Sequence, residues 1–240
     1  MSLSNTAIKF TCVSAIAVGA FLGALEWKLQ SANGQQSNAA TPQRGRTAGL
    51  GGARGDCPAL SAGVSDLTAL TPDKNEDTVT LSQSPTFRFY SPYFSAKYRL
   101  RLFTANKRDV LYRQDIKSSN KTGVFGVSLK NVTALKTKER YFWELEYFCS
   151  DKPNASNPII FGWLYRDQLT ISQQQELSRA KTSANRIDFY RKNGIWVELL
   201  DEIAKSLPQS QIIWQQTLDA EGLQSISRKP ILPTKQSTKP

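Results

Sequence analysis

The residues of this chain best suited to chemistry are two cysteines, Cys57 and Cys149, which lie beyond an apolar leader. The leader predicts export, and an exported chain meets an oxidising compartment in which two thiols tend to pair. The alternative is a thiol redox site, but the chain has no Cys-x-x-Cys motif and nothing marks either thiol as activated. We therefore predict a structural disulfide, worth about 4–5 kcal/mol in the chain-entropy model.

Histidine is absent from the chain. This absence removes the commonest general base at neutral pH and the commonest metal ligand, which counts against much hydrolytic and metal chemistry. The sequence predicts no catalytic residues, no metal site and no cofactor. A carboxylate-based glycosidase is the remaining enzymatic alternative, with Glu144 and Glu146 on one face of an expected strand. Pairing with arginines explains these two carboxylates better.

A second group of candidate residues is basic and aromatic. The net charge of +11 indicates an anionic partner or surface. Arg99 and Arg101 alternate with apolar residues and so face away from the expected core. They predict either a cationic face for an acidic polysaccharide or anionic lipid, or cross-strand ion pairs with the two glutamates, which we favour. An aromatic turn could stack on a ligand, although packing at the edge of the core is the commoner fate. The candidate binding surface comprises Arg88, Arg99, Arg101, Arg113, Tyr90, Tyr93 and Phe94.

Short alternating segments between Cys57 and Leu169 position these residues. Proline and asparagine separate the segments, as expected for turns. Their number and spacing predict a mainly β fold with α: an antiparallel β-sandwich of immunoglobulin or fibronectin type III character, followed by a short C-terminal helical hairpin or bundle. The expected strands are Val79–Leu81, Thr86–Tyr90, Lys97–Thr104, Val110–Ile116, Gly123–Leu129, Tyr141–Cys149 and Ile159–Leu169.

The segment Tyr141–Cys149 supports this prediction in two ways. Leu135 precedes Tyr141 by the interval of a tyrosine corner, in which the tyrosine hydroxyl bonds to the backbone ahead of the strand. Tyr141 and Trp143 also share one face of the strand with Cys149. The cysteine is therefore in phase with the expected core.

The N-terminal part of the chain divides into a leader and a tether. Residues 1–29 contain an uncharged apolar run that predicts a signal peptide, with an uncleaved membrane anchor as the alternative. Residues 30–56 are rich in Gly, Ala and Arg and predict a disordered tether, because they have too little apolar surface to fold. The sandwich domain is expected over residues 57–170. The leader predicts a protein of the periplasm or cell envelope, or a secreted one, with an envelope protein as partner and no nucleic acid.

The C-terminal part is predicted to be helical over residues 171–227 and to end in a basic, proline-rich, disordered tail at 228–240. The middle of this region resembles one tetratricopeptide hairpin, which cannot bury its own apolar face. The helices therefore either pack on the sandwich or on each other, which we favour, or leave a peptide groove open. The expected helices are Ser172–Lys192, Ile195–Leu207 and Ile212–Glu221.

Seven stretches of the chain carry a resemblance to a known family: RGDCPAL, LTALTP, SPTFRFYSPY, RYFWELEYFCSD, FGWLYR, FYRKNGIWVELLDEIAKSLP and WQQTLDAEGL. Their order resembles a cyanobacterial family known as a domain of unknown function, numbered 928. The resemblance implies a bacterial exported or envelope protein with an all-β core and a helical end. It includes both cysteines and the turn from Asn193 to Trp196, and it supplies no catalytic residues.

These observations predict a non-catalytic interaction or scaffold module of the cell envelope. Binding of an acidic polysaccharide or anionic lipid surface is the alternative function, and a glycosidase is a weaker one.

Overall fold

The computed structural model describes residues 45–46, 60–73, 77–118, 120–129, 135–150 and 157–233. Every described residue belongs to one unit, within residues 42–240. The predicted leader and Cys57 therefore lie outside the described residues. Within those residues, no helix has the length and apolar character needed to cross a membrane.

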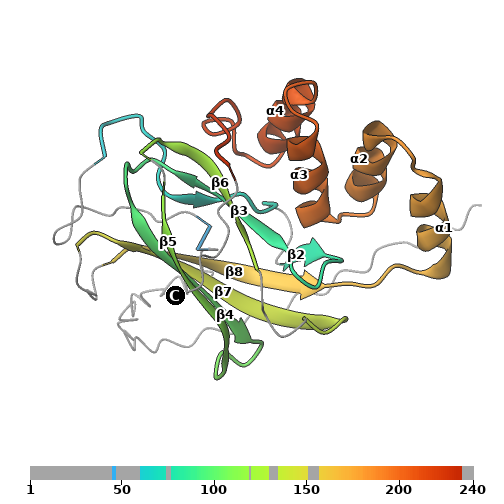
Figure 1. Ribbon diagram of the computed structural model, residues 1–240, viewed down its shortest axis with the longest axis horizontal. Helices are drawn as coiled ribbons and strands as arrows, with labels where there is room; N and C mark the ends of the chain where they lie inside the picture. Colours follow the sequence, from blue (N-terminus) through green and yellow to red (C-terminus); the bar gives the residue numbers. More distant parts are fainter. Residues whose placement is uncertain are drawn as a thin grey trace, which may run out of the picture. The chain divides into compact units, whose positions relative to one another are not determined.

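The described residues form eight strands in two sheets (Figure 1). The larger sheet has the order β2-β8-β7-β4-β5, and the smaller sheet has the order β1-β3-β6. The mainly β fold with C-terminal helices is thus confirmed, while the immunoglobulin or fibronectin type III assignment stays a prediction. The strands are β1 Thr68–Ala69, β2 Asp77–Thr80, β3 Thr86–Ser91, β4 Lys97–Thr104, β5 Val110–Lys117, β6 Gly123–Ser128, β7 Glu139–Phe148 and β8 Ile159–Arg166.

Two features of the sheets differ from the prediction. Strand β1 was not predicted, because its two residues are too few to show alternation. Strand β2 pairs with β8 in parallel, which departs from the predicted antiparallel sandwich. The remaining pairs between the named strands are antiparallel. A hairpin would impose an antiparallel partner, but β2 pairs with a strand far along the chain, so no turn restricts its direction.

The core between the two sheets centres on Trp143 of β7. The ring of Trp143 lies 5.6 Å from Phe87 and 5.7 Å from Phe89 of the opposite sheet, measured between ring centroids. Neighbouring β8 has a glycine here because a Cβ atom at Gly162 would lie 2.7 Å from Cζ2 of the tryptophan. The ring thus lies directly against the backbone of β8. We call the apolar cluster between the two sheets, which contains Trp143, Phe87 and Phe89, the sandwich core.

Tyr141 makes the corner that its spacing predicts. Its hydroxyl accepts a hydrogen bond from the backbone N–H of Lys136 at 2.7 Å, ahead of the strand. The same hydroxyl donates to the Glu139 carboxylate at 3.1 Å. Leu135 is 2% exposed and lies in the sandwich core. The tyrosine therefore fixes the loop before β7 to the strand.

The helices are α1 Ile171–Arg179, α2 Ser183–Lys192, α3 Trp196–Lys205 and α4 Gln211–Asp219. The prediction of one helix over Ser172–Lys192 is wrong. The chain leaves the helical conformation at Ala180, and Thr182 begins α2 by accepting a hydrogen bond from the Asn185 N–H. Threonine is a better N-cap than a helix-interior residue, so a second start competes with a continuous helix.

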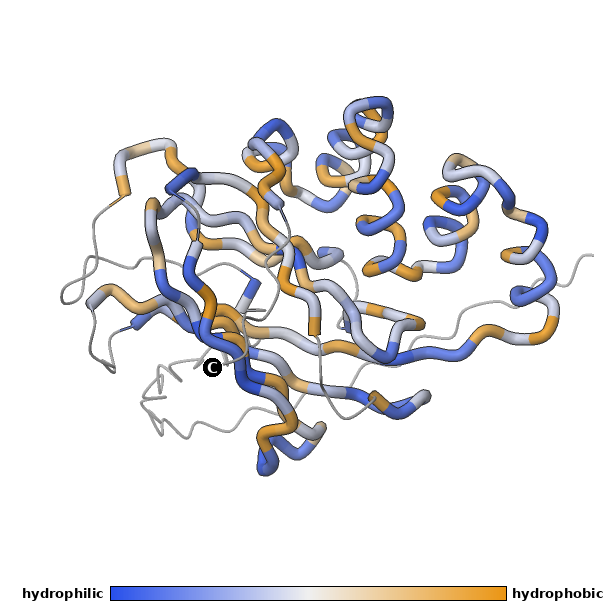
Figure 2. The backbone as a smooth tube through the Cα atoms, viewed as in Figure 1, coloured by the Kyte–Doolittle hydropathy of each residue, from blue (hydrophilic) through white to orange (hydrophobic). Residues whose placement is uncertain are grey.

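Helices α3 and α4 pack on the outer face of the smaller sheet, whereas α1 has no buried residue. Tyr90 of β3 and Val124 of β6 form a second apolar cluster with Trp196, Leu200 and Trp214 of α3 and α4. We call this cluster the helix–sheet core. Figure 2 shows hydrophilic and hydrophobic stretches alternating along the helices. This pattern is typical of helices with one covered face.

Two segments predicted to be disordered belong partly to the fold. In the tail, Ile231 forms a β-bridge with Val124, and Leu232 lies in the sandwich core. In the tether, Gly45 accepts a backbone hydrogen bond from Phe161 of β8, and Arg46 accepts one from Ala69 of β1, each at 2.8 Å. The predictions are therefore wrong for these residues. Backbone pairing with strand edges holds them, and such pairing leaves little trace in composition.

Candidate functional site

Arg101 and Arg99 lie on the outer face of the larger sheet, as predicted. Arg101 is bound to Glu144 at 3.1 Å and to Glu146 at 3.5 Å, which confirms the expected cross-strand pairing. Arg99 instead binds both carboxylate oxygens of Asp115, at 2.7 and 3.0 Å. Asp115 stands opposite Arg99 on the neighbouring strand β5. The sequence analysis did not identify it as an alternative partner to the two glutamates. The hydrogen bond from Arg99 holds the pKa of Asp115 below its usual value.

The Arg88 side chain and Tyr90 are covered, so neither contributes to an exposed binding surface; for Tyr90 this is the core packing favoured from the sequence. The Arg88 side chain is 7% exposed and binds Asp201 of α3 at 2.6 Å. Tyr90 is 2% exposed and packs in the helix–sheet core. Both residues point outward from the smaller sheet, as their phase requires, but the helices cover this face.

The aromatic turn is also split between core and surface. Tyr93 is buried and stacks on Tyr147, with ring centroids 4.0 Å apart. Burial, with smaller contributions from Tyr147 and Asp66, raises the pKa of Tyr93 to about 12. Phe94 is 70% exposed. Of the predicted surface, Arg99, Arg101 and Arg113 thus share one sheet face, while Phe94 lies in the connection between β3 and β4.

A row of aromatic residues on the outer face of the larger sheet was not predicted. Trp163 of β8 stands opposite Phe142 of β7, and Phe142 stands opposite Phe103 of β4. The Lys107 ammonium lies 3.8 Å from the Phe142 ring centroid, and the Arg140 guanidinium lies 4.5 Å from that of Trp163. The alternation of β7 contains this signal, because Phe142 occupies an outward position there.

Cys149 follows β7 directly and is half-buried against the sandwich core. Its backbone N–H donates to the Asn157 side chain at 3.4 Å. Its position agrees with the predicted phase. Because Cys57 lies outside the described residues, the bond between the two cysteines stays a prediction.

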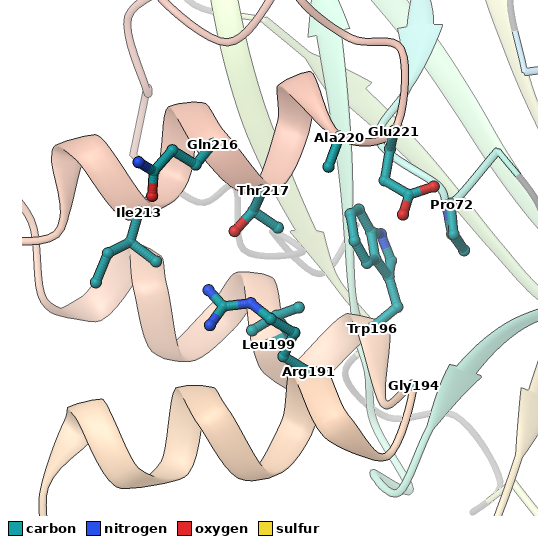
Figure 3. A pocket seen from close by; sticks show the side chains of 10 residues that line it. All are labelled: Pro72, Arg191, Gly194, Trp196, Leu199, Ile213, Gln216, Thr217, Ala220 and Glu221. Atoms are coloured by element: carbon teal, nitrogen blue, oxygen red, sulfur yellow. The ribbon is translucent and has the colours of Figure 1, made fainter.

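Among the described residues, a concave site lies at the helical end, between α2, α3 and α4 (Figure 3). It is a groove of about 410 Å³. Its apolar wall contains Trp196, Leu199 and Ile213. The Trp196 indole is fixed by a 2.7 Å hydrogen bond to the Leu70 carbonyl oxygen. The groove is lined by Pro72, Arg191, Gly194, Trp196, Leu199, Ile213, Gln216, Thr217, Ala220 and Glu221.

The polar residues of the groove have different surroundings. Arg191 extends from the end of α2 along the groove past Leu199 (Figure 3), and its guanidinium pairs with exposed Asp188 at 3.1 Å. Thr217 is 7% exposed, and its buried hydroxyl has no hydrogen-bond partner among the described residues. In Figure 3 this hydroxyl points to the side of the groove where the Arg191 guanidinium lies.

The opposite end of the groove is closed by residues distant in sequence. The Glu221 carboxylate accepts the Asp73 N–H at 2.7 Å, and Arg46 donates to the Glu221 carbonyl oxygen at 2.9 Å. Arg46 also binds the Asp73 carboxylate at 3.3 Å and the Ala69 carbonyl oxygen at 3.4 Å. Sequence reasoning missed this arrangement because the three parts lie in the predicted tether, the loop after β1 and the end of α4.

A buried carboxylate anchors α3, which forms the floor of the groove. Glu198 accepts hydrogen bonds from the Thr80 hydroxyl at 2.8 Å and from the N–H groups of Leu81 and Ser82 at 3.0 Å, all at Oε1. Oε2 is buried, and no part of the described chain donates to it. Burial raises the pKa of Glu198, although these hydrogen bonds oppose the shift.

These features define a class of protein: a β-sandwich whose smaller sheet carries short helices with an open groove. Over the described ranges, no three His, Cys, Asp or Glu residues gather as a metal site would require. The chain belongs to the family described as Domain of Unknown Function (DUF928), whose model matches residues 49–231. This match confirms the family number to which the sequence motifs point. No curated protein matches the chain.

Proposed function

We propose that this protein is an exported, non-catalytic interaction module that holds a partner polypeptide of the cell envelope in the helical groove. The observation that carries the proposal is the groove itself, whose wall is formed by Trp196, Leu199 and Ile213. Its volume lies within the range of about 300–1,000 Å³ that is typical of ligand sites. An apolar wall with a few convergent polar groups favours binding, and no paired acid and base stands there for catalysis.

The proposal is tested by blocking the groove without disturbing the core. Gln216 lines the groove and is exposed, so Gln216→Trp fills the site from α4. Ile212 is on the same helix, is 68% exposed and does not line the groove, so Ile212→Trp is the matched control. We expect a displayed library of random peptides with free carboxyl termini to be enriched on the wild type and on I212W but not on Q216W. Equal enrichment on Q216W would place binding elsewhere and overturn the proposal.

A second candidate function is the binding of an acidic polysaccharide or anionic lipid surface by the outer face of the larger sheet. Arg99, Arg101 and Arg113 share this face with the row of aromatic rings. Internal pairing works against it, because Arg99 and Arg101 already bind carboxylates. The same pairs account for Glu144 and Glu146 more simply than a glycosidase does.

This second function is tested by retention on a sulfated polysaccharide column and on anionic vesicles. Arg113→Gln combined with Lys107→Gln should lower the salt concentration needed for elution, because such binding is screened by ions. Lys181→Gln combined with Lys205→Gln, at two exposed lysines of the helical part, is the charge-matched control. Retention that is absent, or that does not change with salt, would remove this candidate.

We further propose that residues 1–29 direct export and that Cys57 and Cys149 form a disulfide. The phase of Cys149 with the sandwich core supports the bond. Loss of either cysteine to Ser should lower the free energy of unfolding by about 4–5 kcal/mol, whereas Cys12→Ser should not. Thiol titration of the isolated protein before and after reduction measures the bond, and mass spectrometry of the envelope fraction shows whether the leader is removed. Two free thiols beyond the leader in the isolated protein would contradict the proposal.

A further inference from the structure

We infer that the groove recognises the free carboxyl terminus of its partner, with an apolar last residue. This inference rests on the proposed function and names the ligand of the same site. The groove is oppositely charged along its length, since the Arg191 guanidinium lies on the side of Trp196 toward Ile213, and Glu221 lies on the side toward Pro72 (Figure 3). A ligand carboxylate is therefore attracted to one end and repelled from the other.

Thr217 is the observation that points to a polar ligand group. Its hydroxyl is buried within a residue that is 7% exposed, and nothing in the described chain bonds to it. A hydroxyl on a helix commonly bonds back to the carbonyl of the preceding turn, but this one does not. Because an unpaired buried hydroxyl is costly, an acceptor brought by a ligand would recover the lost hydrogen bond. A carboxylate oxygen is such an acceptor.

Arg191 is placed to take the charge of that carboxylate. Its present partner, Asp188, has a side chain that is 75% exposed, so the pair is solvated and easily exchanged. A guanidinium matches a carboxylate with two parallel hydrogen bonds, a geometry that an amide cannot reproduce. One carboxylate of the ligand thus pairs with Arg191 and accepts a hydrogen bond from the Thr217 hydroxyl.

The rest of the groove suits the chain that leads to this carboxylate. Trp196, Leu199 and Ile213 offer apolar surface to the last side chain. At the far end, the Glu221 carboxylate already accepts the Asp73 N–H. It remains acidic toward the ligand, where it can accept a peptide N–H but disfavours a second carboxylate. A peptide with one terminal carboxylate fits this polarity better than a dicarboxylate does.

The test uses the full chain and the labelled peptide Gly-Ser-Gly-Ser-Ala-Leu, as the free acid and as the C-terminal amide. Fluorescence polarisation should show binding of the acid at least about tenfold tighter than that of the amide. Replacing the terminal Leu by Lys should weaken binding by a similar factor. Arg191→Gln should reduce the affinity for the free-acid peptide to that for the amide. Thr217→Val should weaken binding of the free-acid peptide about threefold to tenfold. Lys192→Gln, a change of an exposed neighbouring cation, should leave both affinities unchanged.

The outcomes separate this inference from the proposed function. Equal affinities for acid and amide, or an unaltered preference in R191Q, would overturn carboxylate recognition. If the display library is nevertheless blocked by Q216W, the groove still binds polypeptides and only the inference fails. No measurable affinity for any of these peptides also overturns the inference. If the library is in addition not enriched on the wild type, both the inference and the proposed function fail.

Discussion

The outer face of each sheet carries an arginine in an ion pair, but the two pairs differ in how far they are exposed to water. Arg99 on the larger sheet has an exposed partner, Asp115, whose side chain is 63% accessible. Arg88 on the smaller sheet has a side chain that is 7% exposed and binds Asp201 beneath α3. Both arginines occupy outward positions of their strands. Strand alternation therefore tells which side of a sheet a residue faces, but not whether that side meets water.

The sequence does contain a signal that distinguishes the sheets. Strand β7 alternates between buried and less buried positions from Trp143 to Phe148, as expected for a sheet with one covered face. Strand β6 is buried at every position from Gly123 to Val127. Its Phe125 lies in the sandwich core, while its neighbour Val124 lies in the helix–sheet core. A short continuous apolar strand is typical of a sheet covered on both faces.

The largest expected effect comes from breaking the covered pair. Arg88→Ala should lower the free energy of unfolding by about 3 kcal/mol, because it leaves Asp201 partly buried without its cation. Arg113→Ala removes an exposed arginine from the other outer face and should change stability by less than about 0.5 kcal/mol. Chemical denaturation of both variants measures the difference. Equal losses would show that an outward arginine contributes equally to stability on the two sheets, whether or not helices cover it.

The next effect concerns Glu198, which fixes α3 to the loop after β2. Glu198→Ala removes the acceptor of two partly buried N–H groups and one hydroxyl, and should cost about 2–3 kcal/mol. Glu198→Gln keeps an acceptor oxygen in place and should cost much less at neutral pH. A large and equal loss in both variants would mean that the charge, rather than the acceptor, holds the helix.

Comparison of the wild type with E198Q also has a predicted pH dependence. Because burial raises the pKa of Glu198 in the folded state, the folded protein binds this proton more tightly than the unfolded chain. The contribution of Glu198 is therefore fully present below its unfolded pKa and is lost as pH rises through its raised folded pKa. Urea denaturation at pH 4 and pH 7 should show the wild type losing stability relative to E198Q at the higher pH. A constant difference would contradict the raised pKa.

A smaller effect is expected at the point where the N-terminal segment joins both sheets. Arg46→Ala removes the hydrogen bonds to Ala69, Asp73 and Glu221 and should cost about 1–2 kcal/mol. Hydrogen exchange should accelerate at the Asp73 amide and at neighbouring amides of the groove end. Arg179→Ala, at an exposed arginine of α1, is the control and should leave these amides unchanged. Unaltered exchange in R46A would show that the groove end is held without this arginine.

Local patterns predicted much of the larger sheet correctly. The phase of β7, the Tyr141 corner and the pairing of Arg101 with Glu144 depend on residues within one strand or on adjacent strands. The helical break at Ala180 was missed, although Thr182 carries a local N-cap signal that could have revealed it.

The candidate site could not be predicted in the same way, because its parts meet only through tertiary packing. Arg88 is buried by a helix that begins more than a hundred residues later. The end of the groove unites Arg46 with Asp73 and Glu221. No period of two or 3.6 residues links such distant positions, so composition assigned Arg46 to a tether.

The smallest predicted effect compares the two arginine–aspartate pairs directly. A double-mutant cycle on Arg99 and Asp115, with Ala at each position, should give a coupling energy of about 0.2–1 kcal/mol that falls at high salt. The hydrogen bond from Arg99 lowers the folded pKa of Asp115, so this stabilisation is present above the unfolded pKa and is lost as pH falls through the folded one. The same cycle on Arg88 and Asp201 should give a larger coupling that salt changes little, because helix α3 excludes ions from that pair. Similar couplings with similar salt dependence would mean that the helices do not shield the smaller sheet, and the burial of Arg88 would then need another cause.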